Sequence, residues 1–287
     1  MEYTLGSWLQ EWMELYVWPT GLAKSTKACY NRAVSAVPAR LGDIPLMELS
    51  PLVIRRWLLS VATETPRAAQ LDRQTLRKAL SVAAKCGLCR AGLVDEDVCP
   101  QIEHKASKAA ILTTEQLRRY MAAAAATDVA PPLMLMCCGL RRGEAMGARW
   151  EHIDLQEGTL LVAGQRRDCA QLTADPLKSD ASRRLVALPD QLLHVLRRWP
   201  RDFSGWVCGC GSHKLYSVHK RLLADLGLPH VTLHGLRHSF ATAAAADGVP
   251  IKVLQVSLGH AKYQLTADLY ADHLPSICAV SRSIFAA

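Results

Sequence analysis

Four short segments, far apart in this sequence, constrain its fold most, because their side chains suit a single site. They contain Arg141 in Gly-Leu-Arg, His234 and Arg237 in His-Gly-Leu-Arg, His260 in Leu-Gly-His, and Tyr270 in Ala-Asp-Leu-Tyr. Arginine offers a planar fork to two phosphate oxygens, histidine transfers protons, and an activated tyrosine can attack phosphorus. A fold that gathers these five side chains would therefore suit the transfer of DNA strands.

The spacing of His234 and Arg237 predicts that both lie on one face of a helix, where they can meet one target. A capped helix with a surface arginine would contain the same pair about as often, and Arg141 alone is equally weak evidence. The hypothesis depends on the conjunction of all four segments.

The bulk composition sets broad limits on the class of protein. With 287 residues, 50% of them hydrophobic, the chain has material for two modest domains with real cores. A net charge of +8 is compatible with a nucleic-acid partner, although many basic proteins bind none. The sequence has no signal-peptide pattern and no apolar run of membrane-spanning length, and its ten cysteines fit reduced thiols. We therefore expect a cytoplasmic protein that does not contact a membrane.

Helices are expected to dominate the first hundred residues. Apolar residues from Leu5 to Tyr16 recur at helical spacing, and we expect their aromatic rings to pack in a core. A second helix is expected to begin at Ser25-Thr26, with a hydroxyl as its cap. A third is expected at Ser50-Pro51, with serine as the cap and proline at the first helical position.

A fourth helix, over residues 67–85, is expected to have one apolar and one cationic face. An isolated helix of this kind more often exposes its charges to solvent, but beside a phosphodiester site such a face would neutralise backbone phosphates. The candidate DNA contacts on the second and fourth helices are Lys27, Arg32, Arg67, Arg73, Arg77 and Lys78.

A linker and a mixed second unit are expected to follow. Small and basic residues precede Thr113, and Thr113 with Gln116 forms a capping-box pattern that opens a new helix. Residues 159–163 and 184–188 are expected as strands, and the segment between them is the candidate for a middle strand. Helices are expected again after Trp199.

Together with Lys178, the four segments resemble the motifs of the tyrosine recombinase (phage integrase) family. The flanking runs Arg149–Asp154, Leu236–Thr242 and Thr266–Tyr270 resemble the family as well. The resemblance implies a mainly α fold. A helical core-binding (SAM-like) domain would occupy residues 1–103, a linker 104–112, and a mixed α+β catalytic domain 113–287. That catalytic domain would contain a small three-stranded antiparallel sheet.

By this resemblance Tyr270 attacks the scissile phosphate, which gives a 3′-phosphotyrosine and a free 5′-hydroxyl. A second hydroxyl then reverses the step, so neither ATP nor a metal is implied. Lys178, on a hairpin turn, would protonate the leaving 5′-oxygen; the alternative for this residue is an ordinary loop lysine. Tyr263 is a distant second candidate for the nucleophile, because it lies only three residues after His260.

The resemblance also assigns the residues that would hold the phosphate. Arg141 and Arg237 would bind its non-bridging oxygens as charge builds on phosphorus, and His260 would add a hydrogen bond. His234 would accept or orient a proton. Glu144 is expected to support helix packing or to orient a catalytic side chain.

Two groups of cysteines raise a zinc site as an alternative. The groups are Cys86 with Cys89, and Cys208 with Cys210 near His213. A CxxC pair at the end of a basic helix is more simply a pair of packed thiols, and CxC is not a usual ligand spacing. We therefore expect no metal and no other cofactor.

The tail after Pro275 is amphipathic, so it could pack on its own domain. By resemblance it docks instead on a neighbouring protomer, within a homotetramer on paired double-stranded DNA sites. Two alternative functions stay open: a type IB topoisomerase-like enzyme that relaxes one duplex as a monomer, and a catalytically inactive DNA-binding module. The sequence begins with the core-binding likeness, which favours an Xer-like or small mobile-element integrase without an arm-binding domain.

Overall fold

The computed structural model describes residues 3–102, 110–166, 174–175, 177 and 182–259. The chain divides into two compact units, unit 1 (Met1–Ser107) and unit 2 (Lys108–Ala287), and each is described by itself. No helix among the described residues is long and apolar enough to cross a membrane.

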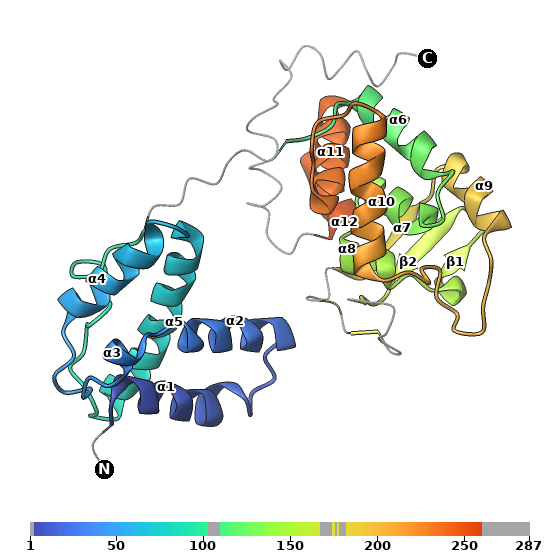
Figure 1. Ribbon diagram of the computed structural model, residues 1–287. Coiled ribbons are helices and arrows are strands. Elements are labelled where there is room, and N and C mark those ends of the chain that lie inside the picture. Colours follow the sequence, from blue (N-terminus) through green and yellow to red (C-terminus); the bar gives the residue numbers. More distant parts are fainter. Residues whose placement is uncertain (1–2, 103–109, 167–173, 176, 178–181, 260–287) are drawn as a thin grey trace. The chain divides into compact units, whose positions relative to one another are not determined.

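Unit 1 is built from helices (Figure 1). In chain order these are α1 (Leu5–Trp12), the π-helical turn η1 (Met13–Val17), α2 (Lys24–Ser35), α3 (Ala39–Gly42), α4 (Pro51–Ala62) and α5 (Pro66–Lys85). Helix α5 is central, because α1, α2 and α4 all pack against it.

Side-chain capping explains the start of α4 but not that of α2. The Ser50 hydroxyl accepts a hydrogen bond from a backbone N–H of the first turn at 3.4 Å, and Pro51 is the first helical residue, as predicted. The prediction that Ser25 or Thr26 caps α2 is wrong. The cap is Ala23, which makes no side-chain bond, so both hydroxyl residues already lie inside the first turn.

The apolar face of the first helix lies in the core of unit 1, as its spacing predicts. Leu5, Trp8 and Trp12 are buried there. The Trp8 indole N–H donates to the Ala79 carbonyl at 3.0 Å and thereby ties α1 to α5. Leu15 and Tyr16 depart from the prediction: they are 58% and 43% exposed, where the helix continues after Trp12 as a π-helical turn.

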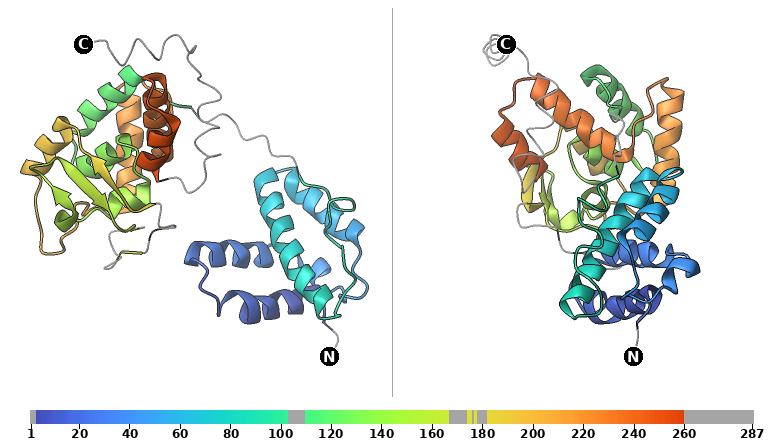
Figure 2. Two further views of the ribbon diagram at one scale, coloured as in Figure 1. Left: turned by 180° about the vertical axis from the view of Figure 1, so that it is seen from behind. Right: turned by 90° about the vertical axis from the view of Figure 1, so that its left-hand side faces the viewer.

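Unit 2 contains further helices around a buried centre. They are α6 (Thr114–Ala124), α7 (Ala130–Cys137), α8 (Arg142–Met146), the 3₁₀ turn η2 (Trp150–His152), α9 (Asp190–Arg198), α10 (Ser212–Asp225), α11 (Leu233–Ala246) and α12 (Ile251–Leu258). Every residue of α7 is buried. Helices α10 and α11 lie on one side of α7, and α9 with the sheet lies on the other (Figures 1 and 2). The predicted capping box is confirmed, since Thr113 and Gln116 bond reciprocally at the start of α6.

A small sheet completes unit 2. Strands β1 (Ile153–Asp154), β2 (Thr159–Val162) and β3 (Arg184–Ala187) are antiparallel, in the order β1-β2-β3. Both predicted strands are confirmed, and the third strand of the described sheet, β1, precedes them; most of the segment expected to hold a middle strand lies outside the described residues. A strand of two residues is too short to show an alternation in the sequence. In the described part of the expected middle strand, Gln165 and Asp175 form an isolated bridge.

The predicted fold class, mainly α with a small three-stranded antiparallel sheet, is confirmed. The sheet places Arg184 at the start of β3, opposite Val162 of β2. Arg184 is buried at this position, where it pairs with Glu144 of α8.

Candidate functional site

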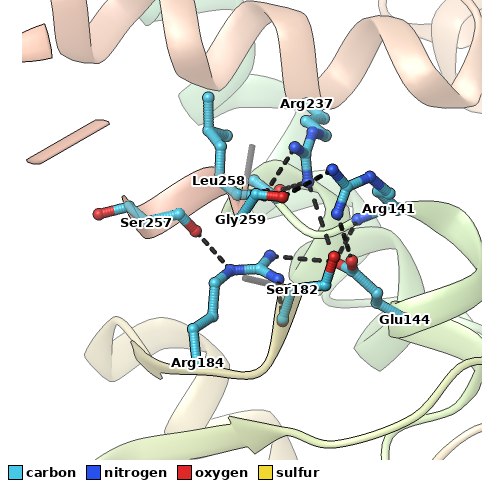
Figure 3. Close-up of polar contacts among 9 residues, drawn as sticks. Arg141, Glu144, Ser182, Arg184, Arg237, Ser257, Leu258 and Gly259 are labelled. Atoms are coloured by element: carbon cyan, nitrogen blue, oxygen red, sulfur yellow. Dashed lines mark hydrogen bonds and ion pairs between the residues drawn. The ribbon is translucent and has the colours of Figure 1, made fainter. Parts of the chain in front are cut away.

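Four charged side chains meet beside α8 (Figure 3). We call Arg141, Glu144, Arg184 and Arg237 the Glu144 cluster. The Glu144 carboxylate is buried, and Arg141 Nη1 donates to its Oε1 at 2.7 Å. Its Oε2 accepts from Arg184 Nη2 at 3.0 Å and from the Arg141 backbone N–H, also at 3.0 Å. Arg237 Nη1 lies 3.8 Å from the same oxygen.

A glycine turn delivers Arg141 to the cluster. Gly139 joins α7 to α8 with a φ of +88°, a conformation that L side chains rarely adopt. A Cβ at this position would also lie 2.8 Å from the Phe240 ring, so the turn requires glycine. Leu140 is buried in the core of unit 2. Arg141 follows as the N-cap residue of α8, and its side chain is 27% exposed.

Arg237 comes to the cluster from α11 and is almost completely buried. Its Nη1 donates to the Gly139 carbonyl at 2.7 Å, and its Nη2 donates to the Leu258 carbonyl, also at 2.7 Å. The Thr232 hydroxyl caps α11 by accepting from the Gly235 N–H at 2.9 Å, which fixes where the helix begins. Arg237 therefore holds the turn before Arg141 as well as the end of α12.

The Glu144 cluster has an excess of positive charge, because three guanidinium groups share one carboxylate. Burial, together with the charges of Arg141 and Arg184, lowers the pKa of Arg237 to about 9, although Glu144 opposes this. Arg237 is therefore still charged at neutral pH. Burial alone would raise the pKa of Glu144, but hydrogen bonds and charge from Arg184 and Arg141 outweigh burial and lower it. Such a site favours the binding of an anion.

The C-terminal end of α12 is bonded to the same arginines. Arg184 Nε donates to the Ser257 carbonyl at 2.6 Å, and Arg141 Nη2 donates to the Gly259 carbonyl at 2.9 Å. With the bond from Arg237 to Leu258, three successive carbonyls accept from three different arginines. Gly259 ends the helix in the left-handed conformation, with a φ of +65°.

His234 lies in the first turn of α11, one turn before Arg237, as the spacing predicts. Its exposed ring is 4.6 Å from the His238 ring, centroid to centroid, with an interplanar angle of 88°. Burial and the charge of Arg237 lower the pKa of His238. The structure thus places a histidine pair beside the arginines.

Three of the predicted catalytic residues, Lys178, His260 and Tyr270, lie outside the described residues. The alternative nucleophile Tyr263 and the amphipathic tail lie outside them as well. Of the predicted set, the structure brings Arg141 and Arg237 together around Glu144, with His234 on the helix of Arg237.

Sequence reasoning missed Arg184 as a member of the cluster. The signal was present: in the predicted strand 184–188, alternation puts residues 184, 186 and 188 on one face. Leu188 is buried and Val186 is partly buried, whereas Leu185 on the other face is 65% exposed. An arginine on the buried face of a strand needs a buried acceptor, and that acceptor is Glu144.

The predicted cationic surface of unit 1 needs one correction. Arg73 is buried and does not belong to the exposed face, because its Nε donates to the Cys99 carbonyl at 2.6 Å and its Nη2 pairs with Glu96 at 2.9 Å. Arg32 is 46% exposed but pairs with buried Asp72 at 2.6 Å.

Other predicted DNA contacts of unit 1 are more accessible. Arg67, Arg77 and Lys78 are exposed on α5. Lys78 contacts the hydroxyl group of Tyr30. Lys27 on α2 donates to the Trp18 carbonyl at 2.7 Å.

A groove with a volume of about 1010 Å³ runs along α5. Arg77, Lys78 and Lys85 contribute to its wall, together with Trp12 and Tyr16. Cations beside aromatic rings are a combination that suits a polyanion.

Comparison with known proteins gives a consistent result. The model of the phage integrase family matches residues 110–276. The chain is 28% identical to prophage integrase IntF of Escherichia coli over 250 residues, which cover 81% of this chain but only 51% of that relative. It is 26% identical to the integrase of Mycobacterium phage D29 (90% and 75% covered) and 29% identical to tyrosine recombinase XerC of Rhodospirillum centenum (84% and 73% covered).

Solved structures show the same fold. The Tn1549 transposon integrase in complex with a circular intermediate DNA superposes with a TM-score of 0.78 at 18% identity, and 98% of each chain is covered. A lambda integrase tetramer bound to a Holliday junction gives a TM-score of 0.70 at 20% identity, with 90% of this chain and 78% of that chain covered.

Proposed function

Because this chain belongs to the phage integrase family, we propose that it is a site-specific DNA recombinase. It would break and rejoin DNA strands through a 3′-phosphotyrosyl intermediate. The observation that carries the proposal is the convergence of Arg141 and Arg237, from segments far apart in sequence, on the buried carboxylate of Glu144.

In the proposed reaction the two arginines bind the non-bridging oxygens of one phosphodiester. Arg141 is the more accessible of the two and has donors left for a ligand, since its five N–H groups exceed its two side-chain bonds. Charge on these oxygens grows in the transition state, where fixed guanidinium donors stabilise it most. His260 adds a hydrogen bond to the same phosphate.

Tyr270 is the proposed nucleophile. Its Oη forms a bond to phosphorus, and the bond between phosphorus and the 5′-oxygen breaks. His234 accepts or orients the phenolic proton, and Lys178 gives a proton to the leaving oxygen. A 5′-hydroxyl from the partner strand then attacks the phosphotyrosine, which restores the tyrosine and a phosphodiester. Bond energy is conserved, so the reaction uses neither ATP nor a metal.

Unit 1 is proposed to bind double-stranded DNA along α5. Its exposed cations Arg77 and Lys78 lie beside the groove, so they can contact phosphates without reading sequence. Arg67 and Lys27 stay candidates of the same kind. Arg73 is withdrawn from the set because it is buried, and Arg32 contributes through the part of its side chain that its ion pair leaves exposed.

We propose that the active assembly is a homotetramer on two paired sites. The lambda integrase relative is a tetramer on a Holliday junction, which supports this stoichiometry. The tail after Pro275 would dock on a neighbouring protomer. Deleting residues 276–287 should then abolish recombination while binding to a single half-site persists. Unchanged recombination by the truncated chain would rule out the exchange.

The test begins with selection of a binding site from random duplexes by the Tyr270→Phe chain. That site is then placed in a duplex nicked beside the cleaved bond, so that the released fragment is lost and the covalent adduct accumulates. Wild-type protein should form an SDS-resistant adduct, whereas Tyr270→Phe should bind but form none. Tyr263→Phe is the matched control and should react normally.

The same assay separates the alternative functions. A topoisomerase would also relax supercoiled plasmids that lack the selected site. An inactive DNA-binding module would bind the selected duplex without forming an adduct. An adduct that survives Tyr270→Phe but not Tyr263→Phe would move the nucleophile to Tyr263.

A further inference from the structure

Arg184 belongs to the Glu144 cluster, but neither the sequence motifs nor the proposed chemistry gives it a task. We propose that it is a positioning residue: it fixes the two chain segments that lead to Lys178 and His260 relative to Glu144. This inference rests on the proposed function for its catalytic meaning, but its structural part can be tested without DNA.

All three nitrogens of the Arg184 guanidinium group are used within the protein. Nε donates to the Ser257 carbonyl at 2.6 Å, Nη1 to the Ser182 carbonyl at 3.0 Å, and Nη2 to Glu144 Oε2 at 3.0 Å. The residue is only 6% exposed. Arg141, by contrast, has a side chain that is 27% exposed. With all three of its nitrogens engaged, Arg184 is placed to hold the protein together.

The three acceptors come from three separate parts of the chain. Ser257 is in the last turn of α12, three residues before His260, and Ser182 follows Lys178 by four residues. Glu144 is in α8, next to the phosphate-binding candidate Arg141. The planar Arg184 side chain thus links two chain segments to Glu144: the one that precedes His260 and the one that follows Lys178. Glu144 is the carboxylate that holds Arg141.

The end of α12 has a particular need for such a residue. The last carbonyls of a helix have no partner within the helix and form its negative end, which cations stabilise. Here Arg184, Arg237 and Arg141 take one carbonyl each, at Ser257, Leu258 and Gly259. When Arg141 and Arg237 redirect donors to a phosphate, Arg184 would keep its bond to Ser257, so the end of α12 would stay in place.

The first experiment measures hydrogen exchange of the DNA-free protein. Arg184→Lys keeps the charge but cannot reach all three acceptors, and Arg184→Ala removes the side chain. Arg183→Ala is the matched control, because it removes the same charge from an exposed neighbour. In both Arg184 variants the amides of the last turn of α12 should exchange about tenfold faster, or more, than in the control. Exchange equal to that of the control would overturn the proposal.

The second experiment is a double-mutant cycle with His260, using the nicked duplex described above. Arg184→Lys should lower the cleavage rate at saturating DNA about 100-fold, the scale expected for a misplaced catalytic group, and change the DNA dissociation constant less than about threefold. In a His260→Ala background the same substitution should lower the rate less, because one of the two groups that it positions is already gone.

The outcomes separate this inference from the proposed function. Equal rate losses in both backgrounds would indicate general destabilisation and overturn the positioning role. If wild-type protein forms no adduct at all, the proposed function fails, and hydrogen exchange alone decides whether Arg184 fixes the end of α12. If Arg184→Ala does not fold, the Arg184→Lys chain decides both experiments.

Discussion

Two arginines of unit 1 and the three arginines of the Glu144 cluster in unit 2 use carboxylates in different ways. In unit 1, Arg32 pairs with Asp72 at 2.6 Å and Arg73 pairs with Glu96 at 2.9 Å, one guanidinium to one carboxylate. In unit 2 three arginines share the carboxylate of Glu144. Balanced pairs hold elements together without attracting a ligand, whereas the unbalanced cluster leaves positive charge that a bound anion would neutralise.

The difference also separates buried arginines with the same accessibility. Arg73 and Arg237 are both nearly inaccessible, and both donate to backbone carbonyls. Arg73 ends at a surface carboxylate, whereas Arg237 lies within a group of like charges that lowers its pKa. Burial alone therefore does not distinguish the structural Arg73 from the catalytic candidate Arg237.

The largest expected effect concerns the unbalanced cluster. Arg141→Ala and Arg237→Lys should each lower the rate of covalent adduct formation by about two to three orders of magnitude, because transition-state charge loses a fixed donor. Single-turnover cleavage of the nicked duplex measures this rate. Arg142→Ala, next in sequence and outside the cluster, is the matched control. A loss of less than about tenfold for both arginines would contradict the comparison.

Glu144→Gln tests whether one carboxylate holds the cluster together. The amide keeps the shape but leaves three buried or half-buried guanidinium groups without a counter-charge, so the free energy of unfolding should fall by about 3 kcal/mol. Urea unfolding monitored by circular dichroism measures it. Glu151→Gln, at an exposed ion pair with Arg149, should change stability by less than about 1 kcal/mol. Equal losses of stability for the two substitutions would contradict the claim that Glu144 holds the cluster together.

Arg73→Gln should separate structure from DNA binding in unit 1. The substitution leaves the Cys99 carbonyl without its donor and should destabilise the chain by about 2 kcal/mol. The salt dependence of DNA binding should stay unchanged, because the Arg73 side chain is buried and its charge is paired with Glu96. Fluorescence anisotropy at several salt concentrations, together with urea unfolding, checks both statements. A shallower salt dependence would return Arg73 to the DNA-binding face.

Arg77→Ala should have the opposite signature. Loss of one exposed cation beside the groove should reduce the slope of log affinity against log salt by about one, with little change in stability. The same titrations measure the slope, and Arg90→Ala, an exposed cation elsewhere on unit 1, is the control. An unchanged slope for Arg77→Ala would remove this residue from the proposed contacts.

The smallest expected effect is a pH dependence of stability. Arginines stay charged throughout the acid range, so a histidine is the expected source of this dependence. Buried His219 bonds to the Tyr120 hydroxyl and the Val231 carbonyl, and burial lowers its pKa below the ordinary value of 6.5. The unfolded chain therefore takes up a proton first, so stability should fall as the pH drops below about 6.5. The melting temperature between pH 8 and pH 5 should fall less steeply in His219→Gln. Parallel curves would exclude this contribution.

Much of this molecule is predictable from its sequence for identifiable reasons. The family and the fold class could be predicted because several short motifs occur in the expected order, and both predictions are confirmed. Ser50 and Thr113 mark helix starts correctly because their hydroxyls bond to N–H groups only a few residues ahead, within the segment that the pattern itself describes.

The rest depends on contacts between distant residues. Nothing near Arg73 in sequence shows that residues 96 and 99 will enclose it, so an amphipathic pattern places it outside. The sequence pattern correctly predicts that Arg184 lies in a strand, but its partner Glu144 lies 40 residues away. Lys178, His260 and Tyr270 lie outside the described residues, and their roles stay predictions.

Because three arginines share the Glu144 carboxylate, mutations in the two units should have unequal effects. A substitution at this one position releases α8, α11 and β3 from their common anchor in a single step. Surface cations of α5 can instead be lost one after another, each with a small decrease in affinity. If the proposed function holds, a degenerating copy of this gene should therefore lose catalysis abruptly while unit 1 still binds DNA.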